Sequence, residues 1–377
     1  MATRGMGSSS TPMDPSIWSR LPCELLERIL ALLPLKTLLS FRSTCKHFNS
    51  LLIRPSFLSQ TKAHLSSSFL LLSHPQSHPL FPLFDASLGS WRTLALSLSL
   101  SLSLPLPLPA SPPHLISTSA GLLCFALPNS FLVFNLLTKS SRTIHFPSYP
   151  FASATLVHDT PGPCPSPASP HGYKIFILCS NSAFLYDSAA DGWAQFGGFN
   201  PILGENSHHE GVSYAGSLFF TTQDPFSVLA FDLASGRWGR LEAPLPHHLT
   251  FIRLVSGAPT GDCRRLFLIG GVGPDGISRN LKVWELDGGA MNWVETATLP
   301  ELMCRKFGSV CYHNYERVYC LWHDGLICIC CFTWPEILVY KVGRRTWHWL
   351  PKCPLLPEKS SCGFRWFSFS PDLHALV

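Results

Sequence analysis

The chain has 377 residues, of which 46% are hydrophobic, 12% aromatic and only 14% charged, and its formal net charge is +5. An intrinsically disordered chain is excluded, because disordered chains are highly charged and poor in aromatic residues. The basic doublets Arg264-Arg265, Arg305-Lys306 and Arg344-Arg345 lie far apart. Direct nucleic-acid binding, which needs a concentrated basic stripe, is therefore not expected.

Residues 1–16 are small and polar, and they predict a disordered lead-in. They lack the apolar core of a secretory signal. Nowhere does the sequence reach the roughly 18 apolar residues of a membrane span. We therefore expect an intracellular chain with no membrane partner, whose 14 cysteines stay reduced.

Residues 17–55 predict three short helices. Pro22 suits the first position of a helix, where its missing N–H costs nothing, and Pro34 ends that helix near Leu33. Between the two prolines, apolar residues form a stripe wider than one packing surface requires: Leu25, Leu26, Ile29, Leu30 and Leu33. Leu38 and Leu51 belong to the second and third amphipathic runs.

The helical segment is too small to bury a stable core alone, since isolated domains below about 40 residues usually need help. Two adjacent apolar stripes on the first helix predict two neighbours, one inside the segment and one on a partner. The alternative is an ordinary helical cap on the domain that follows.

Beyond residue 68 the helical periodicity nearly disappears. Short apolar runs bounded by Gly, Pro, Asn and Asp predict an all-β domain over residues 69–377, joined to the helices by a linker at 56–68. Inside the domain, the low-complexity residues 94–109 alternate Leu with Ser and predict a strand of uncertain register. Pro105, Pro107 and Pro109 break its second half into a loop.

A repeat becomes visible when the aromatic residues of this domain are aligned. Its clearest copy, Phe231-Asp232 followed by Trp238, predicts a strand, a turn opened by the Asp, and a second strand beginning at a Trp that anchors neighbouring sheets. The second strands are placed at Trp91, Thr143, Trp193, Trp238, Trp293 and Trp347, with Glu285 opening the fifth turn. A period of about 50 residues predicts a propeller. Residues 363–369 are expected to pair near residues 69–72 and close it.

Cysteine and histidine residues gather in two places that could indicate chemistry. Cys320, Cys328, Cys330 and Cys331 lack the paired Cys-x2–4-Cys spacing of structural zinc. Cys328 and Cys330 alternate within an apolar strand, which predicts buried thiols. The run His208-His209-Glu210 has no accompanying nucleophile turn and predicts a solvated loop. We therefore expect no catalytic residue, no metal and no cofactor.

The run from Leu21-Pro22 through Leu33-Pro34 to Cys45-Lys46 resembles an F-box, the helical module that binds the Skp adaptor of cullin-RING ubiquitin ligases. The repeats resemble kelch blades, although the kelch Gly-Gly doublet is well placed in one copy, at Gly270-Gly271. The order of the modules resembles the plant F-box/kelch-repeat proteins, in the branch typified by Unusual Floral Organs. The resemblance implies an N-terminal all-α three-helix F-box over residues 17–55, followed by an all-β kelch-type propeller with six blades.

The resemblance also implies a non-enzymatic substrate-recognition adaptor of a Skp–cullin–F-box ubiquitin ligase, in the nucleus, the cytoplasm or both. The F-box would bind the Skp adaptor, and through it the cullin and RING subunits, while the propeller holds an unknown target protein. The residues expected to bind the adaptor are Leu21, Pro22, Leu25, Leu26, Ile29, Leu30, Leu33, Pro34 and Leu38. Two alternatives stay open: a non-degradative protein-binding cofactor of a transcription factor, and a divergent kelch oxidase with a copper site.

Target recognition is expected in the propeller loops, because loops on a rigid scaffold carry recognition. The candidate loops span residues 199–212, 244–252, 272–280 and 300–308. Within them, His208, His209, Arg305 and Lys306 are the candidate target-binding residues.

Overall fold

The chain forms two compact units, residues 1–66 and 67–377. The computed structural model describes residues 16, 20–33, 35–42, 44–51, 54, 56–57, 68–77, 80–96, 113–146, 150–158, 172–179, 182–197, 210–223, 225–259, 263–356, 362–373 and 375–377. The predicted lead-in, most of the linker and most of the low-complexity segment lie outside these described residues.

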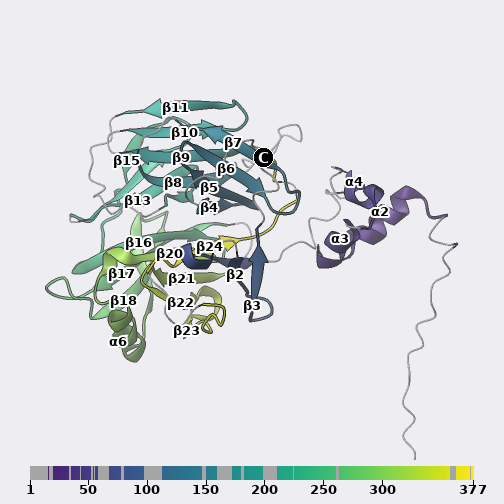
Figure 1. Cartoon of the computed structure of the whole chain (residues 1–377). Coiled ribbons are helices and arrows are strands. Elements are labelled where there is room, and N and C mark those ends of the chain that lie inside the picture. Colours follow the sequence, from purple (N-terminus) through teal and green to yellow (C-terminus); the bar gives the residue numbers. More distant parts are fainter. Residues whose placement is uncertain are drawn as a thin grey trace, which may run out of the picture. The chain divides into compact units, whose positions relative to one another are not determined.

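The first unit contains helices α2 (Cys23–Ala31), α3 (Leu35–Arg42) and α4 (Lys46–Leu51) (Figure 1). The sequence predicted that Pro22 is the first residue of α2. Instead Pro22 lies immediately before this helix, with an extended ψ of 142°. The buried apolar residues of the first unit come from each helix and from the segment after α4: Leu30, Ala31, Leu38, Leu51 and Phe57. None of the helices within the described ranges has the length and hydropathy that crossing a bilayer requires.

The second unit is a propeller of six four-stranded antiparallel sheets, as the repeat predicted. Blade 1 consists of β24 (Arg365–Phe369), β1 (Phe69–Ser73), β2 (Leu80–Asp85) and β3 (Ser90–Ala95). Blade 2 consists of β4 (His114–Ser119), β5 (Leu122–Leu127), β6 (Ser130–Asn135) and β7 (Ser141–His145). Blade 3 consists of β8 (Phe151–His158), β9 (Tyr173–Cys179), β10 (Ala183–Asp187) and β11 (Gly192–Phe196).

The remaining blades follow in chain order. Blade 4 consists of β12 (Val212–Tyr214), β13 (Ser217–Thr221), β14 (Val228–Asp232) and β15 (Trp238–Arg240). Blade 5 consists of β16 (Leu249–Gly257), β17 (Arg265–Val272), β18 (Asn280–Asp287) and β19 (Asn292–Thr298). Blade 6 consists of β20 (Val318–His323), β21 (Leu326–Cys331), β22 (Trp334–Lys341) and β23 (Thr346–Trp349). Helix α6 (Glu301–Val310) and the short 3-10 turn η4 (Tyr315–Arg317) connect blades 5 and 6.

The core of the propeller is divided among the blade interfaces, because each sheet buries both of its faces. Successive side chains of a strand point to opposite faces. In β1, for example, Leu70 and Leu72 pack with residues of blade 6, whereas Leu71 packs with residues of blade 2. One apolar cluster of this kind lies between each pair of neighbouring blades. The inner strands contact one another around the centre, as β4 with β8 and β16 with β20 do.

Blade 1 is completed by the last strand of the chain. β24 pairs with β1 in an antiparallel register that places Phe369 opposite Phe69 and Trp366 opposite Leu72. This confirms the closure predicted from the alternating C-terminal run. Closure pairs the edge of β1, at which another chain could otherwise add a strand.

The repeated hairpins join the third and fourth strands of each blade. The predicted pairs are confirmed in four blades: Phe84 with Trp91, Tyr186 with Trp193, Phe231 with Trp238 and Tyr340 with Trp347. In four blades the predicted first turn residue accepts a backbone N–H through its side-chain oxygen: Asp85, Asn135, Asp187 and Asp232. In blade 5 Asp287 does so.

The predicted register was wrong in blades 2 and 5. Trp293 pairs with Leu286, so Asp287 and not Glu285 opens that turn. The sequence predicted Trp284 as the partner of Trp293, because Trp284 lies two residues before Leu286 and therefore on the same face of the strand. In blade 2 Phe134 pairs with Ser141, and no Trp marks the position.

The hairpin tryptophans of blades 1 and 3 anchor their blade to the one before it, as predicted. The indole Nε1 of Trp91 in blade 1 donates to the carbonyl oxygen of Pro351 after blade 6, at 3.2 Å. That of Trp193 in blade 3 donates to His145 of blade 2, at 2.9 Å. These bonds cross blade interfaces and fix the sheets relative to one another.

Residues 300–308 were predicted to form a loop, but they lie almost entirely within helix α6. Pro300 precedes the helix, and the buried residues Cys304 and Phe307 lie three positions apart on one face. Their packing against blades 5 and 6 stabilises a helix that is too short to be stable alone.

The C-terminal tail beyond β24 crosses blade 2. The side-chain amide of Asn135 donates to the carbonyl oxygens of Asp372 and Ala375, at 2.9 and 2.8 Å. The tail also lies against Gly121, where a Cβ atom would come within 2.5 Å of the backbone nitrogen of Asp372.

We predict that Gly121→Ala destabilises the propeller more than Gly216→Ala does, by about 1–3 kcal/mol in the free energy of unfolding. Both glycines are the second residue of a two-residue hairpin turn, with φ of +84° and +79°. Both substitutions therefore carry the left-handed backbone cost of about 1–2 kcal/mol. Only Gly121 is crowded, since nothing lies within 4 Å of a Cβ at Gly216.

Urea unfolding followed by tryptophan fluorescence measures this difference. Equal destabilisation by the two substitutions would show that the tail does not press on the blade 2 turn.

Candidate functional site

Helix α2 exposes one of its two apolar stripes. Leu25, Ile29 and Leu32 are 47%, 38% and 69% exposed and recur at the i, i+4, i+7 spacing of a single helix face. Leu30 and Ala31 lie on the other stripe and are buried. One stripe thus belongs to the core of the first unit, and the other is an unpartnered apolar surface within the described residues.

The structure divides the residues that the sequence assigned to adaptor binding. Pro22, Leu25 and Ile29 are exposed, Leu21, Leu26 and Leu33 are half-buried, and Leu30 and Leu38 are buried. Pro34 lies outside the described residues. Buried leucines support the fold of the helices and offer no contact surface. Leu32 was missed, although its position seven residues after Leu25 was the signal that could have found it.

Three of the four candidate recognition segments share one end of the propeller, which we call the entry face because the chain enters the first strand of each blade there. Most of the fourth, residues 199–212, lies outside the described residues. Loops that precede the first strand or join the second to the third lie at the same end of an antiparallel sheet. Residues 244–252 and 272–280 are such loops, and α6 is such a connection. Hydrogen bonds join them: Gly273 N donates to His248 O, and Cys304 Sγ to Arg279 O.

The four candidate target-binding residues have different surroundings. His208 and His209 lie outside the described residues. Arg305 is exposed on α6 and pairs with Glu301, one turn earlier. Lys306 has an internal partner: its Nζ lies 2.6 Å from Oε2 of Glu336 and 4.1 Å from the centre of the Trp349 ring.

Glu336 is a buried carboxylate held by two lysines. Its side chain is 6% exposed, and Lys352 Nζ lies 3.2 Å from its second oxygen. Burial opposes ionisation of Glu336, but the hydrogen bonds and charges of Lys306 and Lys352 outweigh it, and the pKa of Glu336 is lowered. Lys306 therefore fastens α6 to blade 6.

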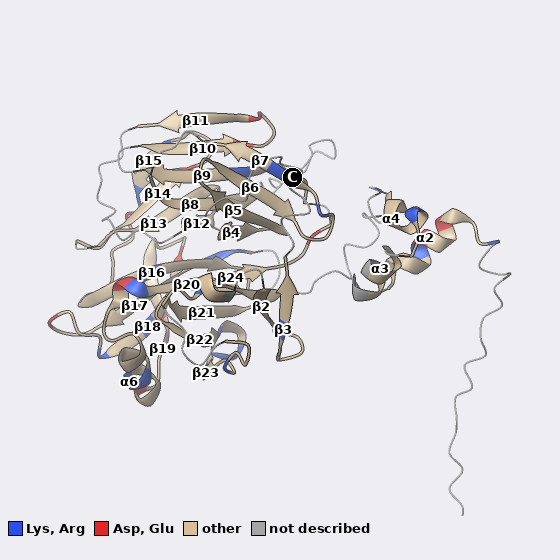
Figure 2. Ribbon diagram, in the orientation of Figure 1, with Lys and Arg blue, Asp and Glu red and all other residues tan. Residues whose placement is uncertain are grey.

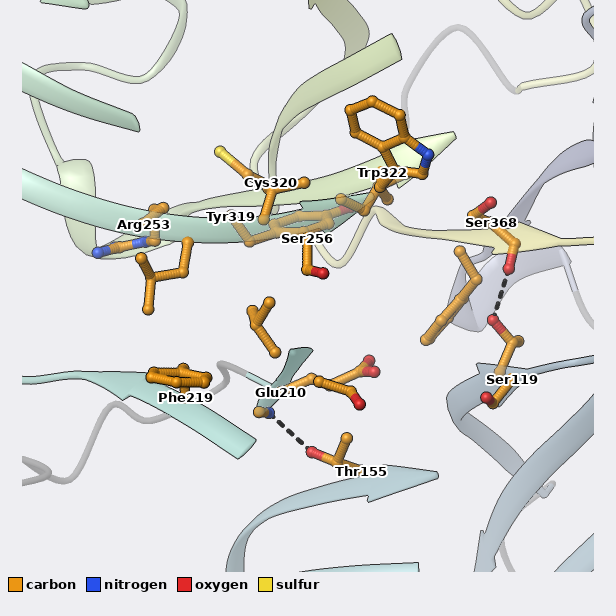
Figure 3. Close-up of a pocket in the computed structure, with 18 of the residues that line it drawn as sticks. Ser119, Thr155, Glu210, Phe219, Arg253, Ser256, Tyr319, Cys320, Trp322 and Ser368 are labelled. Atoms are coloured by element: carbon orange, nitrogen blue, oxygen red, sulfur yellow. Dashed lines mark hydrogen bonds between the residues drawn. The ribbon is translucent and has the colours of Figure 1, made fainter. Parts of the chain in front are cut away.

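A cavity of about 260 Å³ occupies the centre of the ring (Figure 3). All six blades line it, largely through small hydroxyl side chains of their inner strands: Thr118, Ser119, Thr155, Ser213, Ser256 and Ser368. Figure 3 shows Glu210 inside the cavity, between Thr155 and Ser256.

The sequence predicted that Glu210 lies in a solvated loop. This prediction was wrong, because Glu210 crosses the central cavity. One carboxylate oxygen accepts from Arg365 of blade 1 at 3.0 Å, and the other accepts from Ser117 of blade 2 at 2.9 Å. Burial raises the pKa of Glu210, and the charge and hydrogen bond of Arg365 oppose that rise. Glu210 comes from the connection into blade 4, so the ion pair braces opposite sides of the ring.

Three of the four cysteines of blade 6 are buried thiols, as predicted, and Cys320 is half-buried. Cys328 and Cys330 face the interface with blade 1, whereas Cys331 faces blade 5. Burial raises the pKa of Cys320 to about 12. Within the described ranges, no three His, Cys, Asp or Glu side chains are placed to hold a metal ion. Figure 2 shows the charged residues of the described propeller scattered over its blades.

The sequence matches the F-box domain family over residues 18–60. An F-box/kelch-repeat protein of Arabidopsis thaliana is 50% identical, over 98% of this chain and 91% of that protein. ABERRANT PANICLE ORGANIZATION 1 of Oryza sativa subsp. japonica is 29% identical, over 97% of this chain and 91% of that protein. UNUSUAL FLORAL ORGANS of Arabidopsis thaliana is 25% identical, over 92% of this chain and 81% of that protein.

We predict that Glu336→Gln destabilises the protein by about 1–2 kcal/mol near neutral pH. This value is below that of a fully buried pair because Lys306 and Lys352 are 45% and 79% exposed. Since the folded-state pKa is lowered, the stabilisation is present above the unfolded pKa and lost as pH falls through the lowered value.

Urea unfolding of both proteins between about pH 7 and pH 3 tests this, because the difference in unfolding free energy should close toward low pH. Glu301→Gln is the control. It alters an exposed ion pair on α6, the helix that carries Lys306, and should change the unfolding free energy little. A gap that stays constant with pH would contradict an electrostatic role for Glu336.

Proposed function

Because the chain belongs to the F-box/kelch-repeat proteins, we propose that it is a substrate receptor of a Skp–cullin–F-box ubiquitin ligase. The exposed stripe of Leu25, Ile29 and Leu32 is the observation that carries this proposal. It lies within the F-box match, on a unit separate from the propeller. A surface of this kind is typical of a helix that completes its packing on a partner.

The Skp-type adaptor is the partner proposed for this stripe, since F-box domains generally bind such adaptors. Burying a leucine or isoleucine side chain contributes about 1.5–3 kcal/mol. A few such residues in the centre of the contact dominate its affinity. Pro22 and the half-buried Leu21, Leu26 and Leu33 border the stripe, and Leu30 and Leu38 hold its helices in place from within.

The propeller is the proposed target-binding module, and the chain is non-catalytic. Closure by β24, the indole hydrogen bonds and the Glu210 brace make it a rigid platform for the loops of the entry face. In the ligase, the cullin and RING subunits would bring the charged ubiquitin carrier near a lysine of the bound target. Catalysis then follows from proximity, and no residue of this chain touches the reacting bond.

We predict that the double change Leu25→Ala, Ile29→Ala weakens binding of a purified Skp-type adaptor by about 100-fold or more. Both residues are exposed, so their loss removes contact surface without opening a cavity in the core. Isothermal titration calorimetry on the full chain measures the affinity, and circular dichroism checks that the helices remain.

Thr37→Ala on α3 is the matched control, since Thr37 is also exposed on a neighbouring helix. Leu30→Ala should lower the stability of the first unit, because Leu30 is buried. No adaptor binding by the unmodified chain would reject the ligase-receptor proposal, and unchanged binding by the double variant would reject the stripe as the contact.

A further inference from the structure

We propose that the target is bound in a second cavity on the entry face, which adjoins the central one and accepts an uncharged apolar or aromatic side chain of an extended peptide segment. The cavity has a volume of about 540 Å³, within the range of ligand-binding pockets. It lies where blades 4, 5 and 6 meet. This inference deepens the proposed function by assigning the target site and the chemistry of its occupant.

Four of the residues that form the wall of the cavity are aromatic, and two of these, Phe251 and Tyr315, are only 3% and 7% exposed. Phe251 of β16 and Tyr315 of η4 are stacked, with ring centres 4.8 Å apart and planes 14° from parallel. Phe226, from the connection between the second and third strands of blade 4, lies on another side. A planar or aliphatic side chain gains both apolar burial and ring contacts on such a surface.

The buried Arg253 fixes the shape of this wall. Its guanidinium donates to the carbonyl oxygens of Val318, Tyr315 and Ile252, at 2.5, 2.6 and 2.6 Å. Burial lowers the pKa of Arg253 to about 10, so it remains a cation near neutral pH. Because these donors are already used, Arg253 holds the chain around Tyr315 in place. A cavity with a preformed wall loses less entropy on binding.

The charges around the cavity are balanced. The cavity lining holds one cation, Arg253, whose donors bond to backbone carbonyls, and one carboxylate, that of the exposed Glu316. A carboxylate or ammonium group entering the cavity would lose its hydration without gaining an unpaired opposite charge. The occupant that fits is therefore uncharged at this point.

Neutral polar side chains at the mouth fit a peptide backbone. Within the described part of the chain, the amides of Gln223 and Asn314 and the hydroxyl of Thr221 line the cavity without a side-chain hydrogen-bond partner. An amide side chain both donates and accepts, as a peptide group does. An extended segment could therefore bond to these groups while one of its side chains enters the cavity.

The rim is held in an uncommon backbone conformation. Tyr312 and His313 are consecutive non-glycine residues with φ of 51° and 55°, a region that L-residues seldom adopt. The Tyr312 side chain is 78% exposed, although its ring is apolar. Such conformations are concentrated at binding sites, where the surrounding structure enforces them. Here His313 Nδ1 lies 2.9 Å from the hydroxyl of Tyr315 and holds the turn.

The central cavity fits a target less well. It is smaller, at about 260 Å³, and the Glu210–Arg365 ion pair crosses it. A target side chain inserted there would separate the largely buried carboxylate of Glu210 from Arg365. An uncharged side chain could not offset the free-energy cost of leaving these charges unpaired.

A positional-scanning library of acetylated, amidated heptapeptides tests the proposal, with binding to the full chain measured by fluorescence anisotropy. We expect selection of aromatic or large aliphatic residues at one position and exclusion of Asp, Glu, Lys and Arg there. Tyr312→Gly, which removes the ring and tolerates the positive φ, and Gln223→Ala should each weaken the selected peptides by about tenfold or more.

Two controls should leave peptide binding unchanged. Leu88→Ala removes an apolar side chain that is 61% exposed in a turn at the opposite end of blade 1, and Ser256→Ala alters the central cavity. Selection of acidic residues, equal binding by the cavity variants, loss in the Ser256 variant, or no peptide binding at all would each overturn the proposal. Adaptor titration on the same proteins reports on the receptor function separately, because none of these changes lies in the first unit.

Discussion

The pairing of β24 with β1 is the constraint on which the propeller depends. Five blades are built from consecutive strands, but blade 1 takes its inner strand from the end of the chain. Without that strand, β1 would present an open edge at the centre, and the interface between blades 1 and 6 would lose Trp366 from its buried cluster. Each other interface holds its own apolar layer, so closure converts six adjoining layers into one ring.

Polar interactions then make the closed ring rigid where recognition needs it. Glu210 joins blade 4 to blades 1 and 2 across the axis. Arg253 joins blade 5 to the chain that enters blade 6. Arg253 is buried and Glu210 is largely so, and both are hydrogen-bonded, a condition under which a polar network specifies one arrangement. The strands are therefore held rigidly. At the entry face, where the neutral side chains of Gln223 and Asn314 lie, the loops can differ without altering the core.

The two units treat apolar surface in opposite ways. The propeller buries both faces of every blade, whereas helix α2 leaves Leu25, Ile29 and Leu32 exposed. A short helical module cannot bury two stripes against a single small core. The stripe left over is what allows one chain to recruit a partner through its N-terminal unit while a separate unit holds a target.

By itself, the sequence determined the local features: three helices, the hairpins of four blades, four of the Asx turns and the strand that closes the ring. These follow from periodicity and turn chemistry, which act over a few residues. Where an aromatic residue lies two positions before the aliphatic residue that pairs with the hairpin Trp, as Trp284 does before Leu286, the sequence could not fix the register. Only the tertiary structure decided which apolar residues of α2 face outward, that 301–310 is a helix, and that Glu210 lies inside the ring. Those outcomes depend on contacts between residues far apart in the chain, which no local pattern encodes.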